Sequence, residues 1–387
     1  MTPSAASAAR VGLERDARMR IGRIRRAARR HGGPRMRGLV ASPGGVLRWR
    51  AVLRPALTGP QGALVRPIAV ATCDADRPMM LGKTIFPLPL HLGHEVVGEV
   101  VDIGSEVGTV RAGDRVVVPF QISCGRCTAC LRGHTGNCVA VPPTSMYGFG
   151  IAGGLWGGAL AELMAVPFAD AMLVRLPNGV DPAVAAGVAD NICDAYRQVG
   201  PHLPGLLAAD PDARVLIVGR RDIDDPFTPS CLLFTALIAR ALGARDISVV
   251  DARPVFQDRA ATLGFRVLDP RQPRDWPVAD LTVDATGTPS GLRKVLRHTA
   301  TDGICTCAWS MHRRGRLPLQ ASYLRNVTLH IGRSHIRHHI PRVLDLIATG
   351  QLKPELATTN VASFDDAPAA LREHCEHDAL KTILTTE

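Results

Sequence analysis

The stretch Cys124-Gly-Arg-Cys127-Thr-Ala-Cys130, closed by Cys138, decides how the rest of the chain is interpreted. Four thiolates this close together suit a closed tetrahedral Zn²⁺ site, because sulfur is a soft ligand and the short loop costs little closure entropy. An iron–sulfur cluster or disulfides are alternatives. A closed site is mainly structural, so we expect a locked lobe here and chemistry elsewhere.

The composition favours a two-domain protein of 387 residues, without a run of about 18 apolar residues that would predict a membrane span. The net charge is +11, but residues 1–35 hold ten Arg against Glu14 and Asp16, which gives +8. The remainder carries 11 − 8 = +3. This charge distribution therefore does not indicate a nucleic-acid partner.

The basic extension, residues 1–35, admits several interpretations. Its Arg and Ser content is typical of a transit peptide, while Arg25-Arg26 could indicate twin-arginine export, although no apolar segment follows. It could also be an amphipathic arm, or precede a true start near Met36. We expect a disordered or marginally helical extension without a chemical role.

The other cysteines are scattered rather than arranged as a disulfide framework. No secretion signal is recognisable, so a reducing cytoplasm is the simplest expectation. These cysteines are Cys73, Cys193, Cys231, Cys305, Cys307 and Cys375.

Two styles of secondary structure follow one another along the chain. Short strands punctuated by Gly and Pro predict a compact β domain, at residues 38–41, 46–52, 62–71, 94–104 and 115–119. From about residue 181 strands alternate with helices, which predicts a doubly wound parallel sheet. We place its strands at 214–218, 246–251, 279–284 and 302–308, and helices at 230–242 and 291–297; helices at 339–349 and 364–372 and a strand at 381–385 follow.

A second metal site could form from three distant residues: Cys73, His94 and Asp190. Cys, His and a carboxylate make a plausible three-ligand zinc set with an open fourth position. Spacing alone does not establish it, since a lone Cys in an apolar run is usually a core residue.

The order of motifs resembles the zinc-dependent medium-chain alcohol dehydrogenase family, in particular its formaldehyde- and threonine-dehydrogenase-like branches. The motifs are Cys73, then Gly93-His94-Glu95-x2-Gly98, then Gly113-Asp114-Arg115-Val, the four-cysteine lobe and a βαβ region. The resemblance covers about residues 36–387 and implies an α/β fold. It implies a GroES-like zinc catalytic domain at 36–186 and 335–387, around a Rossmann dinucleotide-binding domain at 187–334.

The resemblance implies a catalytic zinc held by Cys73, His94 and Asp190, with Glu95 beside it. Zinc would act as a Lewis acid toward an alcohol or carbonyl while hydride passes to or from nicotinamide. Asp76 matches the residue that fixes the tautomer of the ligating His. The chain departs at Ala75, where the family has Thr or Ser for proton transfer; Asp74, Asp194 and His91 are weak substitutes.

The cofactor turn departs further. The segment after Gly219, residues 220–230, is about six residues longer than the family's turn, and Leu232 stands where its last glycine is expected. Its acids Asp222, Asp224 and Asp225 would oppose a diphosphate if they point inward, with Arg220 and Arg221 to offset them. Thr228 and Pro229 should still cap the following helix. Both a changed binding mode and a lost cofactor stay open.

The second half of the cofactor fingerprint is better preserved. Asp251 ends the next strand, where an acid binds the ribose and favours NAD over NADP. Its alternative role is to cap a turn. We also expect Arg253, Thr286 and Gly287 near the cofactor.

These features predict a zinc-dependent, NAD(P)-linked oxidoreductase of small alcohols or carbonyls, with one catalytic and one structural zinc. We expect a homodimer or homotetramer, pairing through the edge strand near 326–331. The alternative is a zinc protein of the same fold with altered or lost cofactor use, either a non-redox biosynthetic enzyme or a binding protein. Trp156 and Tyr147 are weak candidates for the cleft, and the run His335-Ile-Arg-His338-His339 is interpreted as a hinge.

Overall fold

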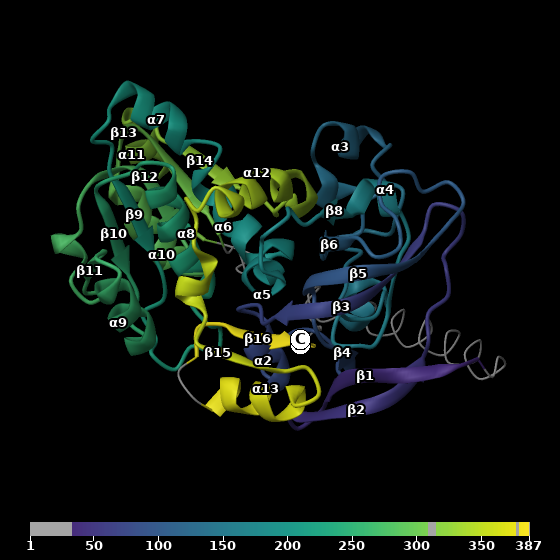
Figure 1. Ribbon diagram of the computed structural model, residues 1–387. Coiled ribbons are helices and arrows are strands. Elements are labelled where there is room, and N and C mark those ends of the chain that lie inside the picture. The colour runs from purple at the N-terminus through teal and green to yellow at the C-terminus, as the bar shows by residue number, and fades with distance from the viewer. Residues whose placement is uncertain (1–32, 309–314, 377–378, 387) are drawn as a thin grey trace, which may run out of the picture.

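The computed structural model describes residues 33–308, 315–376 and 379–386, which form two units joined by long helices (Figure 1). The first unit is β-rich and the second is a doubly wound α/β unit. Figure 1 shows the two side by side, with α6 and α12 between them.

The β-rich unit contains two sheets. The larger has the order β15-β16-β3-β5-β6-β8, with β7 paired to β3, and the smaller has the order β2-β1-β4. Their strands are β1 (Arg35–Ser42), β2 (Val46–Leu53), β3 (Ala63–Ala71), β4 (Leu90–His91), β5 (Glu95–Ile103), β6 (Arg115–Val118), β7 (Met164–Val166), β8 (Val174–Arg175), β15 (Asn360–Ser363) and β16 (Thr382–Thr385).

The pair β3 and β5 forms the centre of this unit, antiparallel with Ala71 opposite Glu95. Gly98 lies opposite Pro67, and a Cβ there would approach Cγ1 of Val65 to 2.4 Å and the carbonyl oxygen of Arg66 to 2.7 Å. Only glycine fits such a close approach of two strands. The register brings the residues just after β3 and just before β5 together.

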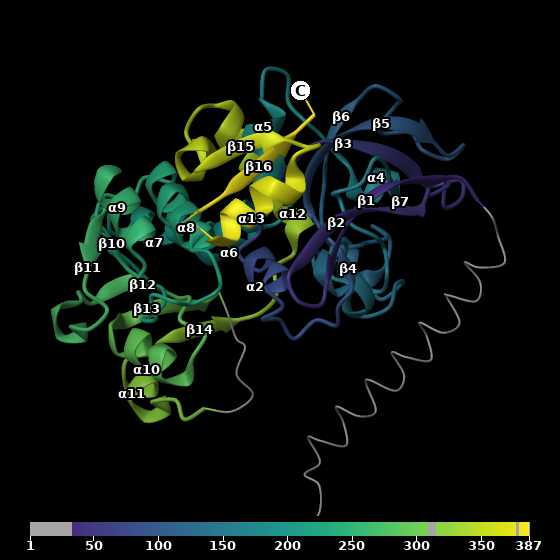
Figure 2. The ribbon, with the colours of Figure 1, turned by 90° about the horizontal axis from the view of Figure 1, so that it is seen from below.

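The second unit is a six-stranded parallel sheet with the order β11-β10-β9-β12-β13-β14. Its first strand, β9, is buried along its whole length, as expected for a parallel strand covered on both faces. In Figure 2 the sheet lies between a layer with α8 and α9 and a layer with α10 and α11. The strands are β9 (Val215–Val218), β10 (Ile247–Val250), β11 (Arg266–Leu268), β12 (Ala279–Asp284), β13 (Thr299–Cys307) and β14 (Thr328–Ile331).

The order of this sheet reverses between β9 and β12, so the carboxyl ends of these strands mark the usual ligand crevice of the fold. The helices are α2 (Asp76–Met80), α3 (Thr128–Leu131), α4 (Ala169–Met172), α5 (Pro182–Ala185), α6 (Asn191–Val199), α7 (Leu203–Ala209), α8 (Ser230–Ala241), α9 (Pro254–Thr262), α10 (Pro289–Arg297), α11 (Leu319–Leu324), α12 (Ile336–Ala348) and α13 (Ala367–Glu376). Short 3-10 turns are η1 (Thr135–Asn137), η2 (Gly150–Gly153), η3 (Ala186–Ala189), η4 (Pro273–Asp275) and η5 (Pro354–Ala357).

The fold class predicted from the sequence is confirmed: a β-rich unit accompanies a Rossmann-type, doubly wound parallel sheet. The last strand of the chain, β16, returns to pair with β3, and β14 is an edge strand as expected. Residues 1–32 of the basic extension lie outside the described residues, and β1 begins at Arg35. Within the described residues, no helix is both long and apolar enough to cross a membrane.

Candidate metal and cofactor sites

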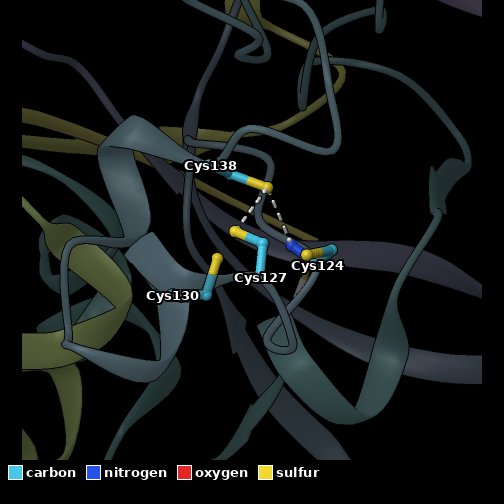
Figure 3. Close-up of side chains that lie close together, drawn as sticks. All are labelled: Cys124, Cys127, Cys130 and Cys138. Carbon is cyan, nitrogen blue, oxygen red and sulfur yellow. Dashed lines mark hydrogen bonds between the residues drawn. The ribbon is translucent and has the colours of Figure 1, made fainter.

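The four cysteines of the lobe converge on one point (Figure 3). Their sulfur atoms all lie within 4.8 Å of one another, with 3.9 Å between Cys127 Sγ and Cys138 Sγ. The backbone N–H of Cys124 donates to Cys138 Sγ over 3.4 Å. Backbone N–H groups of Cys130 and Val139 lower the pKa of Cys127 to about 6, which favours thiolate. None of the described cysteines forms a disulfide, and this donor set fits one zinc ion.

The second cluster joins Cys73, His94 and Asp190. Cys73 follows β3 and His94 precedes β5, so the strand register places them together, while Asp190 lies at the turn into α6. Asp190 Oδ2 lies 3.2 Å from Cys73 Sγ and 3.3 Å from His94 Nε2. All three residues are buried.

The ring of His94 has no hydrogen bond on either nitrogen among the described residues, although the side chain is completely buried. Buried polar atoms without partners are rare and point to a missing partner. Asp76 Oδ1, also without a hydrogen bond, lies 3.7 Å from His94 Nδ1. Burial alone lowers the pKa of His94, but Asp76 and Asp190 raise it to about 9. A pocket this negative, with an open imidazole nitrogen, fits a divalent cation.

Glu95 lies beside this cluster but is held by a partner that the sequence did not reveal. Lys381 Nζ lies 2.6 Å from Glu95 Oε2, and both side chains are at most 1% exposed. The backbone N–H of Asn191 donates to Glu95 Oε1 over 3.3 Å. The Glu95 carboxylate raises the pKa of Lys381 against the effect of burial, which lowers it. Lys381 comes from the C-terminal segment, where a single lysine carries no recognisable signal.

A cavity of about 630 Å³ opens beside Cys73 and Asp190, between the two units. The aromatic side chains on its wall are Phe86, Phe120, Phe149 and Phe227, and the cationic ones are Lys83, Arg197, Arg220 and Arg333. Trp156 and Tyr147, the candidates named from the sequence, are not among its lining residues. Tyr147 is buried and donates its hydroxyl to the carbonyl oxygen of Ala165 at 2.8 Å.

The cationic groups in this cavity differ in their partners. Arg197 pairs with Asp194 over 2.6 Å, and Arg220 pairs with Asp225 over 2.9 Å. Arg333 makes no hydrogen bond or ion pair with any of the described residues. Among the described residues that line the cavity, Arg333 is therefore the one whose guanidinium is available to a ligand.

The turn after β9 is built differently from a glycine-rich phosphate turn. A Cβ on Gly219 would lie 2.1 Å from Asp251 Oδ2 and 2.3 Å from Leu232 Cδ2, so Leu232 and Asp251 pack directly on this glycine. Asp222 and Asp224 are exposed, and Asp225 is paired with Arg220. The predicted capping of α8 by Thr228 and Pro229 is wrong: Pro229 stands at the N-cap without a side-chain hydrogen bond, and the hydroxyl of Thr228 donates to Asp74 Oδ1 at 2.9 Å instead.

The better-preserved half of the cofactor fingerprint is also bound by groups of the protein itself. Asp251 Oδ1 and Oδ2 lie 2.7 Å and 2.5 Å from the guanidinium of Arg253, and Asp251 Oδ2 accepts from the N–H of Arg220. Thr286 lines a separate cavity of about 330 Å³ at the carboxyl ends of β9 and β10, together with Arg221 and Lys294. Gly287 has φ +66° and lies against the guanidinium of Arg220.

The histidine run, interpreted as a hinge, packs the start of α12 against the cysteine lobe. His335 Nδ1 accepts from the backbone N–H of Gly136 at 3.2 Å, and its ring stacks on His134 with centroids 5.1 Å apart. Burial lowers the pKa of His335 and of His339 to about 4. These rings are therefore neutral packing groups near neutral pH.

Comparison with known proteins places these features in context. Residues 59–178 match the family model for the alcohol dehydrogenase GroES-like domain. The chain is 33% identical over 263 residues to a glutathione-independent formaldehyde dehydrogenase of Pseudomonas aeruginosa, and this match covers 65% of the chain and 63% of that relative. A formaldehyde dismutase of Pseudomonas putida is 29% identical, covering 58% of the chain and 57% of the relative. These matches thus span less than two thirds of either relative.

The fold extends the similarity over most of the chain. The alcohol dehydrogenase TADH from Thermus sp. ATN1 superposes with a TM-score of 0.80 at 28% identity, covering 90% of the chain and 99% of that structure.

Proposed function

Because the chain belongs to the zinc-dependent medium-chain alcohol dehydrogenase family, we propose that it is an oxidoreductase that interconverts a small alcohol and its carbonyl compound, with NAD(P) as the hydride partner. In this proposal Cys73, His94 and Asp190 hold the catalytic zinc, and the four-cysteine lobe holds a structural zinc. The cavity between the two units receives the substrate.

The observation that carries the proposal is the buried imidazole of His94, open on Nε2 beside Asp190 and Cys73, which both line the cavity. When bound, zinc would supply Lewis acidity toward the substrate oxygen, and nicotinamide would accept or donate the hydride. Thiolate at Cys73, carboxylate at Asp190 and neutral His94 balance the charge of the divalent ion, so negative charge developing on the substrate oxygen is not opposed by a negative centre.

Asp76 would keep His94 in the required tautomer. Its Oδ2 accepts the backbone N–H of Cys73 at 2.8 Å, which leaves Oδ1 directed to His94 Nδ1. A proton held on Nδ1 leaves Nε2 free as a ligand atom. Ala75 offers no hydroxyl for proton transfer, so protons would leave the cavity through water.

The wall of the cavity supports a substrate class. Phe86, Phe120 and Phe149 would pack on an apolar body, and Arg333 would pair with an anionic group on the same molecule. We therefore propose a carboxylated alcohol or aldehyde rather than a purely apolar one.

The choice of dinucleotide is part of the proposal. Asp251 at the end of β10 favours NAD, because a carboxylate repels the 2′-phosphate of NADP. Arg253 neutralises this carboxylate, and Arg221 and Lys294 line the adjacent cavity. We propose that the protein binds NAD more tightly than NADP, with a smaller difference in affinity than an unpaired Asp251 would give. A homodimer or homotetramer in the cytoplasm remains our expectation.

A second candidate function is favoured by the turn after β9. The bulky side chain of Leu232 on Gly219, and the carboxylate of Asp74 at the amino terminus of α8, support a protein of this fold with altered or lost dinucleotide use.

Calorimetric titration with NAD⁺ and NADP⁺, followed by absorbance assays with carboxylated and plain alcohols, separates the two candidates. Saturable binding with reduction of the dinucleotide is expected. Absence of binding of either dinucleotide at millimolar concentration would contradict the dehydrogenase proposal and favour the second candidate.

A further inference from the structure

The amino terminus of α8 is filled by a carboxylate from the other unit of the protein. Asp74 Oδ1 accepts hydrogen bonds from the N–H of Ser230 at 3.1 Å and its hydroxyl at 2.5 Å, and from the hydroxyl of Thr228 at 2.9 Å. Asp74 Oδ2 accepts from the N–H of Cys231 at 3.1 Å. The side chain is 1% exposed. Asp74 thus caps α8 in place of a residue of its own turn.

The same carboxylate is tied to the candidate zinc site. Asp74 directly follows Cys73, and Asn191, the neighbour of Asp190, donates its amide to Asp74 Oδ1 at 3.1 Å. The carbonyl oxygen of Asp74 also accepts the N–H of Thr228 at 3.3 Å. The loop that carries Cys73 is therefore fastened to the first helix of the dinucleotide-binding fold.

The free N–H groups at a helix amino terminus, with the positive end of the helix dipole, form an anion site. In doubly wound folds the helix after the first strand presents this end to the diphosphate of a dinucleotide. Here that helix is α8, because it follows β9 at the point where the strand order reverses. Asp74 uses the N–H groups of Ser230 and Cys231, which a diphosphate would need.

The turn that precedes α8 is closed by its own contacts as well. Arg220 pairs with Asp225 and lies over the ring of Phe227, with 4.8 Å between the guanidinium carbon and the ring centroid. Arg253, besides its pair with Asp251, donates to the carbonyl oxygen of Phe227. Arg220 and Arg253 are thus engaged with protein groups. The residues present do not fit a diphosphate bound in the usual way.

We propose that Asp74 is an internal anion that occupies the diphosphate position at α8, so that a dinucleotide can use this helix only after Asp74 withdraws. This rests on the proposed function in one respect only, the identity of the competing ligand. Because Asp74 adjoins Cys73, its withdrawal would also shift the loop of the candidate zinc site. Cofactor binding and the geometry of that site are then coupled.

The test uses inorganic diphosphate, titrated calorimetrically into the zinc-loaded protein. Asp74→Gly vacates the position and should bind diphosphate at least about tenfold more tightly than the wild type, the equivalent of one charge-assisted hydrogen bond. Asp74→Asn is the matched control: it removes the charge but still fills and caps the helix, so its gain should stay below about threefold. Binding by Asp74→Gly that is no tighter than that of the wild type would overturn the proposal.

The zinc content of Asp74→Gly shows whether this variant still folds. A second variant tests the proposal if it does not. Ser230→Ala removes the hydroxyl donor to Asp74 and keeps the backbone N–H, so it should strengthen diphosphate binding by a few-fold. No gain in this variant would also count against the proposal.

The same proteins separate this inference from the proposed function. A gain in diphosphate binding without NAD⁺ or NADP⁺ binding in any form would uphold the role of Asp74 and reject the dehydrogenase. Equal binding of NAD⁺ to the wild type and Asp74→Gly, with no gain for diphosphate, would reject the role of Asp74 and leave the dehydrogenase proposal standing.

Discussion

Replacing Lys381 by Met should destabilise the zinc-loaded protein by about 3–5 kcal/mol, because it leaves the Glu95 carboxylate buried without a counter-charge. The two groups lie 2.6 Å apart and are at most 1% exposed, so water cannot take over the role of the lysine. Met fills a similar volume, but it loses the positive charge of Lys381 Nζ, which also lies over the ring of Phe234, 5.5 Å from the ring centroid. The loss is therefore electrostatic rather than a packing defect.

The double variant Lys381→Met/Glu95→Gln tests this attribution. A neutral glutamine side chain at position 95 needs no counter-charge, and its amide oxygen can still accept the N–H of Asn191. We expect the double variant to recover at least half of the stability lost by Lys381→Met. The measurement is urea denaturation followed by circular dichroism, with zinc content determined for each form.

Two results would refute this reasoning: a loss below about 1 kcal/mol in Lys381→Met, or a double variant as unstable as the single one. The first would mean that Glu95 is hydrated or protonated at no cost. The second would mean that the lysine stem, and not its charge, holds β16 in place.

The remaining predictions concern other parts of the molecule. Burial lowers the pKa of His374 to about 3, below the 6.5 of the unfolded chain, so the neutral ring stabilises the fold fully above pH 6.5 and less as the pH falls. At pH 5 the loss is about 2 kcal/mol. In His374→Gln the urea midpoint should therefore change less between pH 6.5 and pH 5 than it does in the wild type. An equal change of the urea midpoint with pH in the wild type and in His374→Gln would contradict this prediction. Arg333→Gln should raise KM at least about tenfold for a carboxylated alcohol, with little change for its uncharged analogue; equal effects on both would exclude the proposed pairing. Gly98→Ala should cost more than about 2 kcal/mol in urea denaturation, because its Cβ would meet the backbone of β3; a neutral outcome would mean that β3 and β5 separate easily.

The sequence was most informative where chemistry and spacing are local. The cysteine lobe was predicted from four residues within one loop, and the strands and helices followed from apolar periodicity and from Gly and Pro. The convergence of Cys73, His94 and Asp190 agrees with the resemblance to the family, since spacing alone gives no distance between residues so far apart in the chain.

Three functional features were missed, for one physical reason. Lys381, Arg333 and the capping role of Asp74 arise where the chain returns to an earlier segment, and no local pattern records which acid meets which base. The local sequence at Thr228 and Pro229 predicts a helix cap, but the buried carboxylate of Asp74 from the other unit accepts the first N–H groups of α8 instead. Asp251 stands at the expected strand end, yet Arg253 two residues later takes its carboxylate.

The most direct test of the account is an anomalous diffraction map at the zinc edge from crystals of the zinc-loaded protein. We expect two peaks per chain, one among the four cysteines and one about 2.0–2.3 Å from Cys73 Sγ, His94 Nε2 and an oxygen of Asp190. A single peak, at the cysteine lobe alone, would contradict the central claim that these three residues form a catalytic zinc site.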